Sequence, residues 1–270
     1  AFAKRHGQQY GIGCNSGTST LHAALEAFGV GPGDEVIIPS LTVAMCGYAV
    51  THANAIPVYA DVDPSTFCID PIVIERKITS KTTAIMVVHL YGLMCNMEEI
   101  ERIAKKHSLY ILEGCAQCFL ANDHRGVIAG TAGDVGSWSF ENSKHLYCGD
   151  GGIVTTDNPI LAEFMRQYAG VGFKNIIASR GKVRISRDKF QNPDWKCHNI
   201  LAYNYRLPEI CAAVALSQVE KIDWLCDLRS QMGLGYLSVI KKLNLDLLIP
   251  QLTPKGYTNS YYTFACKFNG

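Results

Sequence analysis

Short apolar runs alternate with segments of helical periodicity over the first two thirds of the chain, and this alternation constrains the fold most. The apolar runs predict strands at 35–38, 56–60, 83–88, 109–113, 135–140 and 152–155. Helical spacing predicts helices at 18–28, 43–52, 71–78, 97–107 and 159–169. This order predicts an α/β fold with a mostly parallel central sheet. Ligands of such sheets bind beyond the carboxyl ends of the strands, so functional residues are expected there.

Composition excludes several classes of protein. Of 270 residues, 48% are apolar and 18% charged, which favours a packed core over a disordered or collagen-like chain. The net charge of +1 lacks the basic excess of a dedicated nucleic-acid binder, so we expect no nucleic-acid partner. Apolar runs such as 84–88 are far shorter than the roughly 20 residues of a membrane span, and we recognise no secretory or transit signal. We therefore expect a cytoplasmic protein without a membrane partner.

The 11 cysteines are scattered through apolar runs, where a free thiol behaves as a small hydrophobic side chain. This usage is typical of reduced thiols in a cytoplasmic protein. Only Cys115 and Cys118 have CxxC spacing, and no second pair or suitably spaced histidines follow, so we predict no metal site. A redox role for this pair is the less favoured alternative.

A glycine-rich segment precedes the first predicted helix. Gly11, Gly13 and Gly17 are spaced GxGxxxG, one residue longer than the dinucleotide fingerprint, which argues against a nucleotide-binding oxidoreductase. Residues 15–19 read Asn-Ser-Gly-Thr-Ser and begin the helix. A helix start of this composition is suited to bind a phosphate, but it also matches an ordinary Ser/Thr cap. Both interpretations stay open.

A single lysine follows the strand predicted at 135–140. Lys144 lies in a polar turn before the glycine-rich segment 149–152. A lysine near strand ends that is partly desolvated can lose its proton and attack an aldehyde, and Ser139 and Ser143 are placed to donate to a phosphate beside it. Taken alone, Lys144 is equally consistent with a solvated loop lysine.

The order of the motifs resembles the DegT/StrS-type family of sugar aminotransferases, which are pyridoxal-phosphate enzymes of fold type I. The matching motifs are Asn-Ser-Gly-Thr at 15–18, Gly-Asp-Glu at 33–35, His-Leu-Tyr-Gly at 89–92, Ser139 and Lys144, Gly-Asp-Gly-Gly at 149–152, and Asn-Tyr-Arg at 204–206. The resemblance implies a large cofactor-binding domain over 1–225. It further implies a linking helix and the beginning of a small C-terminal α+β domain over 226–270, in a fragment of a longer chain.

The resemblance also implies how pyridoxal 5′-phosphate is bound. Lys144 would form the internal aldimine and then carry the proton between the substrate Cα and the cofactor C4′. Gly17 and Thr18 would hold the cofactor phosphate through helix amides, with a hydroxyl from Ser139. Gln117 would lie near the O3′ atom of the ring.

Asn204 matches a family residue that reaches the phosphate of the partner subunit, so the resemblance implies a homodimer. The amino donor would be glutamate or glutamine. The acceptor would be a keto-sugar, often nucleotide-linked, or a keto-cyclitol.

Two positions depart from the family pattern. The family has Glu-Asp where this chain has Glu113-Gly114, and that Asp keeps the cofactor ring protonated so that it accepts electrons. Glu113 is not expected to replace it, because adjacent strand residues point to opposite faces. The family commonly stacks an aromatic side chain where this chain has Val43. We therefore predict weakened transamination, with a catalytically impaired, cofactor-binding paralogue of non-enzymatic or regulatory role as the alternative.

Residues 173–198 carry seven Lys and Arg against two Asp, a local excess of +5. Without a clear period, this segment predicts a long loop or extended hairpin. One hypothesis is that its cations grip the diphosphate of a nucleotide-linked acceptor beside the active site; the alternative is a solvated surface loop. Helical patterns resume at 208–222 and, after a break, at 224–243, and a strand-like run follows at 261–268.

Overall fold

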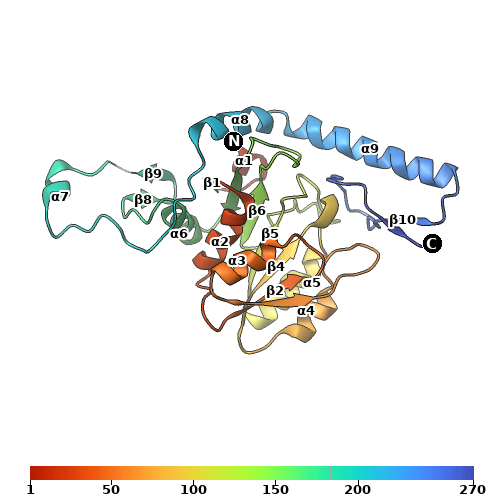
Figure 1. Ribbon diagram of the computed structural model, residues 1–270, viewed down its shortest axis with the longest axis horizontal. Coiled ribbons are helices and arrows are strands. Elements are labelled where there is room, and N and C mark those ends of the chain that lie inside the picture. Colours follow the sequence, from red (N-terminus) through yellow and green to blue (C-terminus); the bar gives the residue numbers. More distant parts are fainter. Residues whose placement is uncertain (183) are drawn as a thin grey trace.

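A seven-stranded sheet organises the computed structural model, which describes residues 1–182 and 184–270. The strand order is β1-β7-β6-β5-β4-β2-β3 (Figure 1). The strands are β1 (Tyr10–Cys14), β2 (Glu35–Pro39), β3 (Ile56–Ala60), β4 (Thr82–Val88), β5 (Tyr110–Gly114), β6 (Val135–Ser139) and β7 (Gly152–Thr156). Strand β7 is antiparallel to both of its neighbours, and the other neighbours pair in parallel. The predicted α/β fold with a mostly parallel sheet is confirmed.

Helices cover both faces of the sheet, because side chains alternate between the faces along each strand. In β4, Ile85 and Val87 join one hydrophobic cluster, whereas Met86 and Val88 join the other. The first cluster is covered by α1 (Phe2–Arg5), α4 (Pro71–Lys77) and α5 (Met97–His107). The second is covered by α2 (Gly17–Ala27), α3 (Met45–His52) and α6 (Pro159–Ala169). Helices α2 to α6 match the predicted ones within two residues at each end.

Helix α5 shows how local sequence sets these helices. The side chain of Asn96 caps the helix by accepting from the Glu99 amide at 3.4 Å, and Ser108 ends it in the left-handed conformation. Acidic residues in the first turn and basic residues in the last turn complement the helix dipole. Met97, Ile100 and Ile103 bury one face against the sheet.

Strand β1 was not among the predicted strands, because glycines at 11 and 13 weaken its strand propensity. It forms at the sheet edge by antiparallel pairing with β7. Packing is tight at both glycines: a Cβ at Gly11 would lie 3.1 Å from the Ala3 Cβ, and one at Gly13 would lie 3.1 Å from Leu207 Cδ2, so these neighbours would have to shift. The segment that superficially resembles a dinucleotide fingerprint is therefore an edge strand.

The basic segment forms an arm that projects from the body of the molecule (Figure 1). It contains the antiparallel pair β8 (Ile176–Ile177) and β9 (Arg180–Lys182), followed by α7 (Arg187–Gln191). The segment predicted as a long loop or extended hairpin thus contains a short hairpin over 176–182, and the short helix α7 was not predicted. Residue 183 and the side chains of Lys182 and Phe190 lie outside the part of the chain that the structure describes.

The C-terminal part of the chain begins with α8 (Glu209–Val219) and α9 (Ile222–Lys242), which confirms the two predicted helices and the break between them. The antiparallel pair β10 (Leu248–Pro250) and β11 (Cys266–Phe268) follows, and η1 (Leu90–Gly92) is a short 3-10 helix. The strand expected at 261–268 forms only at its end, where β11 pairs with β10, and the left-handed backbone of Tyr261, with φ of 45°, interrupts an extended conformation at its start. The domain boundary at 225/226 stays a prediction.

No helix of the described residues is long and apolar enough to cross a membrane.

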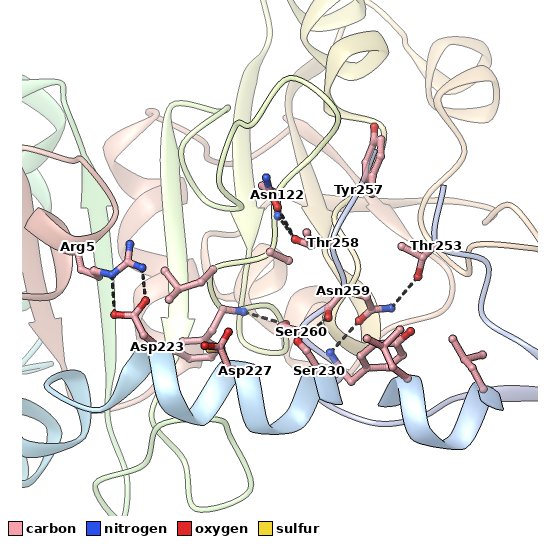
Figure 2. Close-up of a pocket in the computed structure, with 17 residues that line it drawn as sticks. Arg5, Asn122, Asp223, Asp227, Ser230, Thr253, Tyr257, Thr258, Asn259 and Ser260 are labelled. Carbon is pink, nitrogen blue, oxygen red and sulfur yellow. Dashed lines mark hydrogen bonds and ion pairs between the residues drawn. The ribbon is translucent and has the colours of Figure 1, made fainter. Parts of the chain in front are cut away.

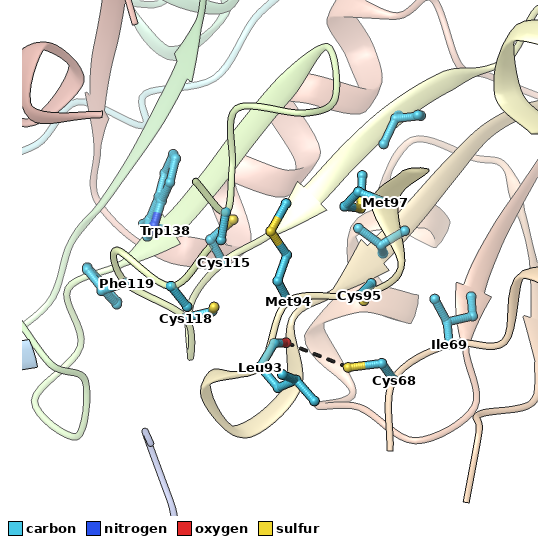
Figure 3. Packing of buried hydrophobic residues seen from close by; sticks show 14 of the residues in the cluster. Cys68, Ile69, Leu93, Met94, Cys95, Met97, Cys115, Cys118, Phe119 and Trp138 are labelled. Atoms are coloured by element: carbon cyan, nitrogen blue, oxygen red, sulfur yellow. Dashed lines mark hydrogen bonds between the residues drawn. The ribbon is translucent and has the colours of Figure 1, made fainter. Parts of the chain in front are cut away.

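All 11 cysteines in the described chain are free thiols. Cys68, Cys95, Cys115 and Cys118 are buried in one hydrophobic cluster, where they pack with large apolar side chains such as Met94 (Figure 3). They act there as small hydrophobic residues, as their sequence context indicates.

Candidate active site

A cavity of about 350 Å³ lies at the carboxyl end of the sheet. Val88, Gly114 and Ser139, the last residues of β4, β5 and β6, all line it. The predicted cofactor residues that line this cavity are Gly17, Thr18, Gln117, Ser139 and Lys144. Residues spread over more than 120 positions of sequence therefore meet at the strand ends.

The N-terminus of α2 forms one wall of the cavity. The Ser16 hydroxyl accepts from the Ser19 amide at 3.1 Å, and the first intrahelical bond runs from the Thr20 amide to the Ser16 carbonyl at 3.3 Å. The amides of Gly17 and Thr18 precede that bond and border the cavity. The serine cap uses the Ser19 amide, so capping is compatible with anion binding by the Gly17 and Thr18 amides.

Gly17 permits β6 to approach the helix start closely. A Cβ at this position would lie 2.7 Å from the Cβ of Ser139, closer than real Cβ contacts allow. Ser139 is buried, and its hydroxyl accepts from the Glu141 amide at 3.3 Å. The close approach brings a hydroxyl beside the free helix amides, which is the donor set that a phosphate needs.

Lys144 extends from the turn after β6, and only 13% of its side chain is exposed. Its amine lies 4.0 Å from Glu141 Oε2 and 3.4 Å from the hydroxyl of Tyr262. Tyr262 was absent from the predicted site residues. No motif links it to Lys144, and 118 positions of sequence separate the two residues.

Gln117 follows β5 and is buried. Its Oε1 accepts from the Tyr91 amide at 2.9 Å, and Tyr91 itself has a left-handed backbone conformation with φ of 61°. The bond fixes the side-chain amide of Gln117 at the cavity wall.

Glu113 and Gly114 face opposite sides of the sheet. Gly114 lines the cavity, so no carboxylate extends from the position where the family has Asp. The Glu113 carboxylate accepts instead from His89 Nε2 and the Gly130 amide, both at 2.8 Å, and from the amides of residues 132–133. Because it is buried and committed to these donors, Glu113 is not available to the cavity.

His89, Glu113 and Cys115 bring potential metal ligands within 4.8 Å of one another. His89 Nδ1 accepts from the Cys95 amide at 3.1 Å, so its Nε2 carries the proton donated to Glu113. Hydrogen bonds already account for this cluster. Burial raises the pKa of the Cys115 and Cys118 thiols well above the ordinary value, which disfavours the thiolate that a redox CxxC motif needs.

Asn204 does not reach the cavity of its own chain. It is exposed, and its Oδ1 accepts from Arg206 Nε at 2.9 Å. Its role toward a partner subunit stays a prediction.

Val43 lines the cavity and is 44% exposed. None of the described residues of the basic arm lines the cavity.

Comparisons with known proteins agree with this geometry. The sequence profile of the DegT/DnrJ/EryC1/StrS aminotransferase family matches residues 1–269. The chain is 40% identical over 223 residues to GDP-perosamine synthase of Caulobacter vibrioides, covering 83% of this chain and 55% of that protein. It is 35% identical over 268 residues to L-glutamine:2-deoxy-scyllo-inosose aminotransferase of Streptomyces fradiae, covering 99% and 61%.

The crystal structure of S. venezuelae DesV in complex with a ketimine intermediate is similar, with a TM-score of 0.86 and 32% identity. The alignment covers 99% of this chain and 66% of that chain. The chain therefore spans less than two thirds of the length of either curated relative.

Proposed function

The chain belongs to the DegT/DnrJ/EryC1/StrS aminotransferase family, and we propose that it transfers an amino group with pyridoxal 5′-phosphate as cofactor. The donor is glutamate or glutamine, and the acceptor is a keto-sugar, either nucleotide-linked or free, or a keto-cyclitol. The observation that carries this proposal is the Lys144 amine in the same cavity as Gly17, Thr18 and Ser139. The names of two relatives support these classes. GDP-perosamine synthase supports a nucleotide-linked sugar, and L-glutamine:2-deoxy-scyllo-inosose aminotransferase supports glutamine as donor and a keto-cyclitol as acceptor.

The residues present fit the phosphate and the aldehyde of this cofactor. Gly17 and Thr18 would hold the phosphate through amides at the positive end of α2, and Ser139 would add a hydroxyl. Lys144 would bind the aldehyde carbon and, once released, move the proton at the reacting substrate carbon. Gln117 would orient the ring from the cavity wall. When bound, the cofactor supplies an electron sink for that carbon.

Gly114 is the position where the fit is incomplete. Gly114 contributes no carboxylate to pair with the ring nitrogen, and Glu113 is committed elsewhere. The acidic residues that line the cavity, Glu141 and Asp150, come from the segment after β6 rather than from β5. We therefore propose that transamination by this chain is slow. The alternative that Gly114 favours is an impaired paralogue that retains the cofactor in a regulatory role.

We also propose a homodimer in the cytoplasm. Helix α8 carries apolar residues on all sides, yet Ile210 is 82% exposed and Val214 and Leu216 are also exposed. A helix of this kind is normally buried, which supports a second copy packed against it. The 11 free thiols support a reducing compartment.

Absorbance spectra test the function. Adding pyridoxal 5′-phosphate should produce the visible band of a lysine-linked cofactor, and adding glutamine or glutamate should then bleach it slowly. A band that persists with both donors supports the cofactor-binding paralogue. The absence of any band refutes the proposed cofactor.

The basic arm permits a separate test of the nucleotide-linked acceptor. Because none of its described residues lines the cavity of the same chain, its cations would act on a partner subunit's cavity. Replacing Arg184 and Arg187 with Glu should weaken binding of a nucleoside-diphosphate sugar by at least about tenfold if these cations bind the diphosphate. Unchanged binding identifies the arm as a solvated surface segment.

A further inference from the structure

The C-terminal segment places a tyrosine against the amine of Lys144. The Tyr262 hydroxyl lies 3.4 Å from Lys144 Nζ, and the ring centroid lies 4.7 Å from the same atom. The hydroxyl contact is longer than an ordinary hydrogen bond, as contacts to catalytic groups often are before ligands bind. The cation–π contact adds a second attraction to the same amine.

Tyr262 is held firmly in this position. Two residues earlier, the Ser260 amide donates to the Gly92 carbonyl at 2.9 Å, and His145 Nε2 donates to the Ser260 carbonyl at 2.8 Å. The Tyr262 carbonyl accepts from Arg229 Nη1 of α9 at 3.0 Å. Figure 2 shows the neighbouring residues 257–260 between α9 and the loop of Asn122. Because His145 is the next residue after Lys144, the same contacts fix both partners.

Hydrogen-bond directions around Tyr262 follow from the groups present. The Ser143 hydroxyl donates to Glu141 Oε2 at 2.5 Å, because a carboxylate only accepts. The Ser143 oxygen, 3.0 Å from the Tyr262 hydroxyl, therefore accepts from it. The lone pairs of Tyr262 are then free to accept from the Lys144 amine. The bond from Ser143 holds the pKa of the Glu141 carboxyl below its ordinary value, so this chain of bonds ends on an anion at neutral pH.

We propose that Tyr262 is a positioning residue that holds the Lys144 amine in the cofactor cavity, with its hydroxyl oriented by Ser143 and Glu141. The proposal rests on the proposed function for the role of Lys144, but the contact itself exists without the cofactor. If Lys144 binds the cofactor aldehyde, its amine would have to be released when the amino donor binds. The released amine must stay beside the reacting carbon, and a hydroxyl anchored by the C-terminal segment keeps it there.

Chemical labelling of the cofactor-free protein tests the contact directly. Lysines are acetylated with acetic anhydride, and the rate at each is measured by peptide mass spectrometry, with the other lysines as internal references. In Tyr262→Phe, labelling of Lys144 should be about threefold faster, which is the effect of one modest hydrogen bond. Tyr261→Phe is the matched control, because it removes a neighbouring hydroxyl that does not touch Lys144. Equal labelling of Lys144 in Tyr262→Phe and the unmodified chain overturns the proposal.

The loaded protein provides a spectroscopic measurement that a purely structural tyrosine would not change. Tyr262→Phe removes a hydrogen-bond acceptor from the nitrogen of Lys144. The pH at which half of the visible band is lost should therefore fall by about half a unit, which corresponds to the same threefold effect. Glu141→Gln should shift the midpoint in the same direction, and Tyr261→Phe should not. An unshifted midpoint in Tyr262→Phe refutes the proposal. If the unmodified chain shows no visible band, the proposed function fails and the labelling result alone decides the role of Tyr262.

Discussion

Replacing Gly114 with Asp restores a carboxylate to the cavity at the position where the family pairs one with the cofactor ring. The change has a steric cost that the structure defines. A Cβ at Gly114 would lie 3.0 Å from the Val87 carbonyl oxygen and 3.3 Å from Val88 Cγ2. These neighbours must shift by a few tenths of an ångström, for which we expect a cost of about 1 kcal/mol in folding free energy.

The gain comes from a hydrogen bond to a charged group, which contributes roughly 1.5–3 kcal/mol. The steric cost at Gly114 is present with and without cofactor, so it lowers the stability of the fold but not the affinity, and the full contribution of about 1.5–3 kcal/mol favours the cofactor complex. Since 1.4 kcal/mol corresponds to a factor of ten, the affinity for pyridoxal 5′-phosphate should rise roughly 10- to 150-fold. The rate of bleaching by glutamine should rise more, because a protonated ring also stabilises the developing carbanion.

Two measurements check this prediction. Absorbance titration gives the dissociation constant of the cofactor, and stopped-flow absorbance gives the rate of bleaching. Gly114→Asn is the matched control, because it has almost the same shape and steric cost without the negative charge. Thermal denaturation without cofactor measures that cost in both variants.

If Gly114→Asp binds the cofactor more tightly and bleaches faster than Gly114→Asn, the missing partner of the ring nitrogen is supported as the cause of slow transamination. Equal affinities and rates in Gly114→Asp and Gly114→Asn would refute that reasoning. The limitation would then lie elsewhere, for example at Val43, which replaces the stacking aromatic of the family.

Three further predictions follow from single contacts. Lys144→Ala should abolish the visible band, while circular dichroism stays unchanged; a retained band removes Lys144 from its role. Gly17→Ala should destabilise the fold by about 1–3 kcal/mol and weaken cofactor binding, because the new Cβ would lie 2.7 Å from that of Ser139, and denaturant titration measures the loss. Burial lowers the pKa of His6 and of His145 to about 4, so below pH 6.5 the unfolded chain binds protons that the native chain does not. Stability should therefore fall as the pH drops from about 6.5 toward 4, by roughly 2 kcal/mol per histidine at pH 5, and urea unfolding at pH 7.5 and pH 5 should show no difference if this assignment is wrong.

The helices and strands of the sheet could largely be predicted, because local chemistry decides them. The apolar spacing of 97–107 and its charged ends specify α5 without reference to any distant residue. Strand β1 could not be predicted in this way. Its glycines are unfavourable in a strand, and only pairing with β7 and contact with Leu207 offset their cost.

The order of the motifs, through their resemblance to the family, predicted Lys144, Ser139 and the helix start at Gly17 as the candidate site, although each motif alone left its role open. It also identified Gly114 as the missing carboxylate. Only the tertiary structure decided that Glu113 is committed to buried amides and that Tyr262 reaches Lys144. The physical reason is that residue type and periodicity act over a few positions, whereas a hydrogen bond between residues 118 positions apart depends on how the whole chain packs.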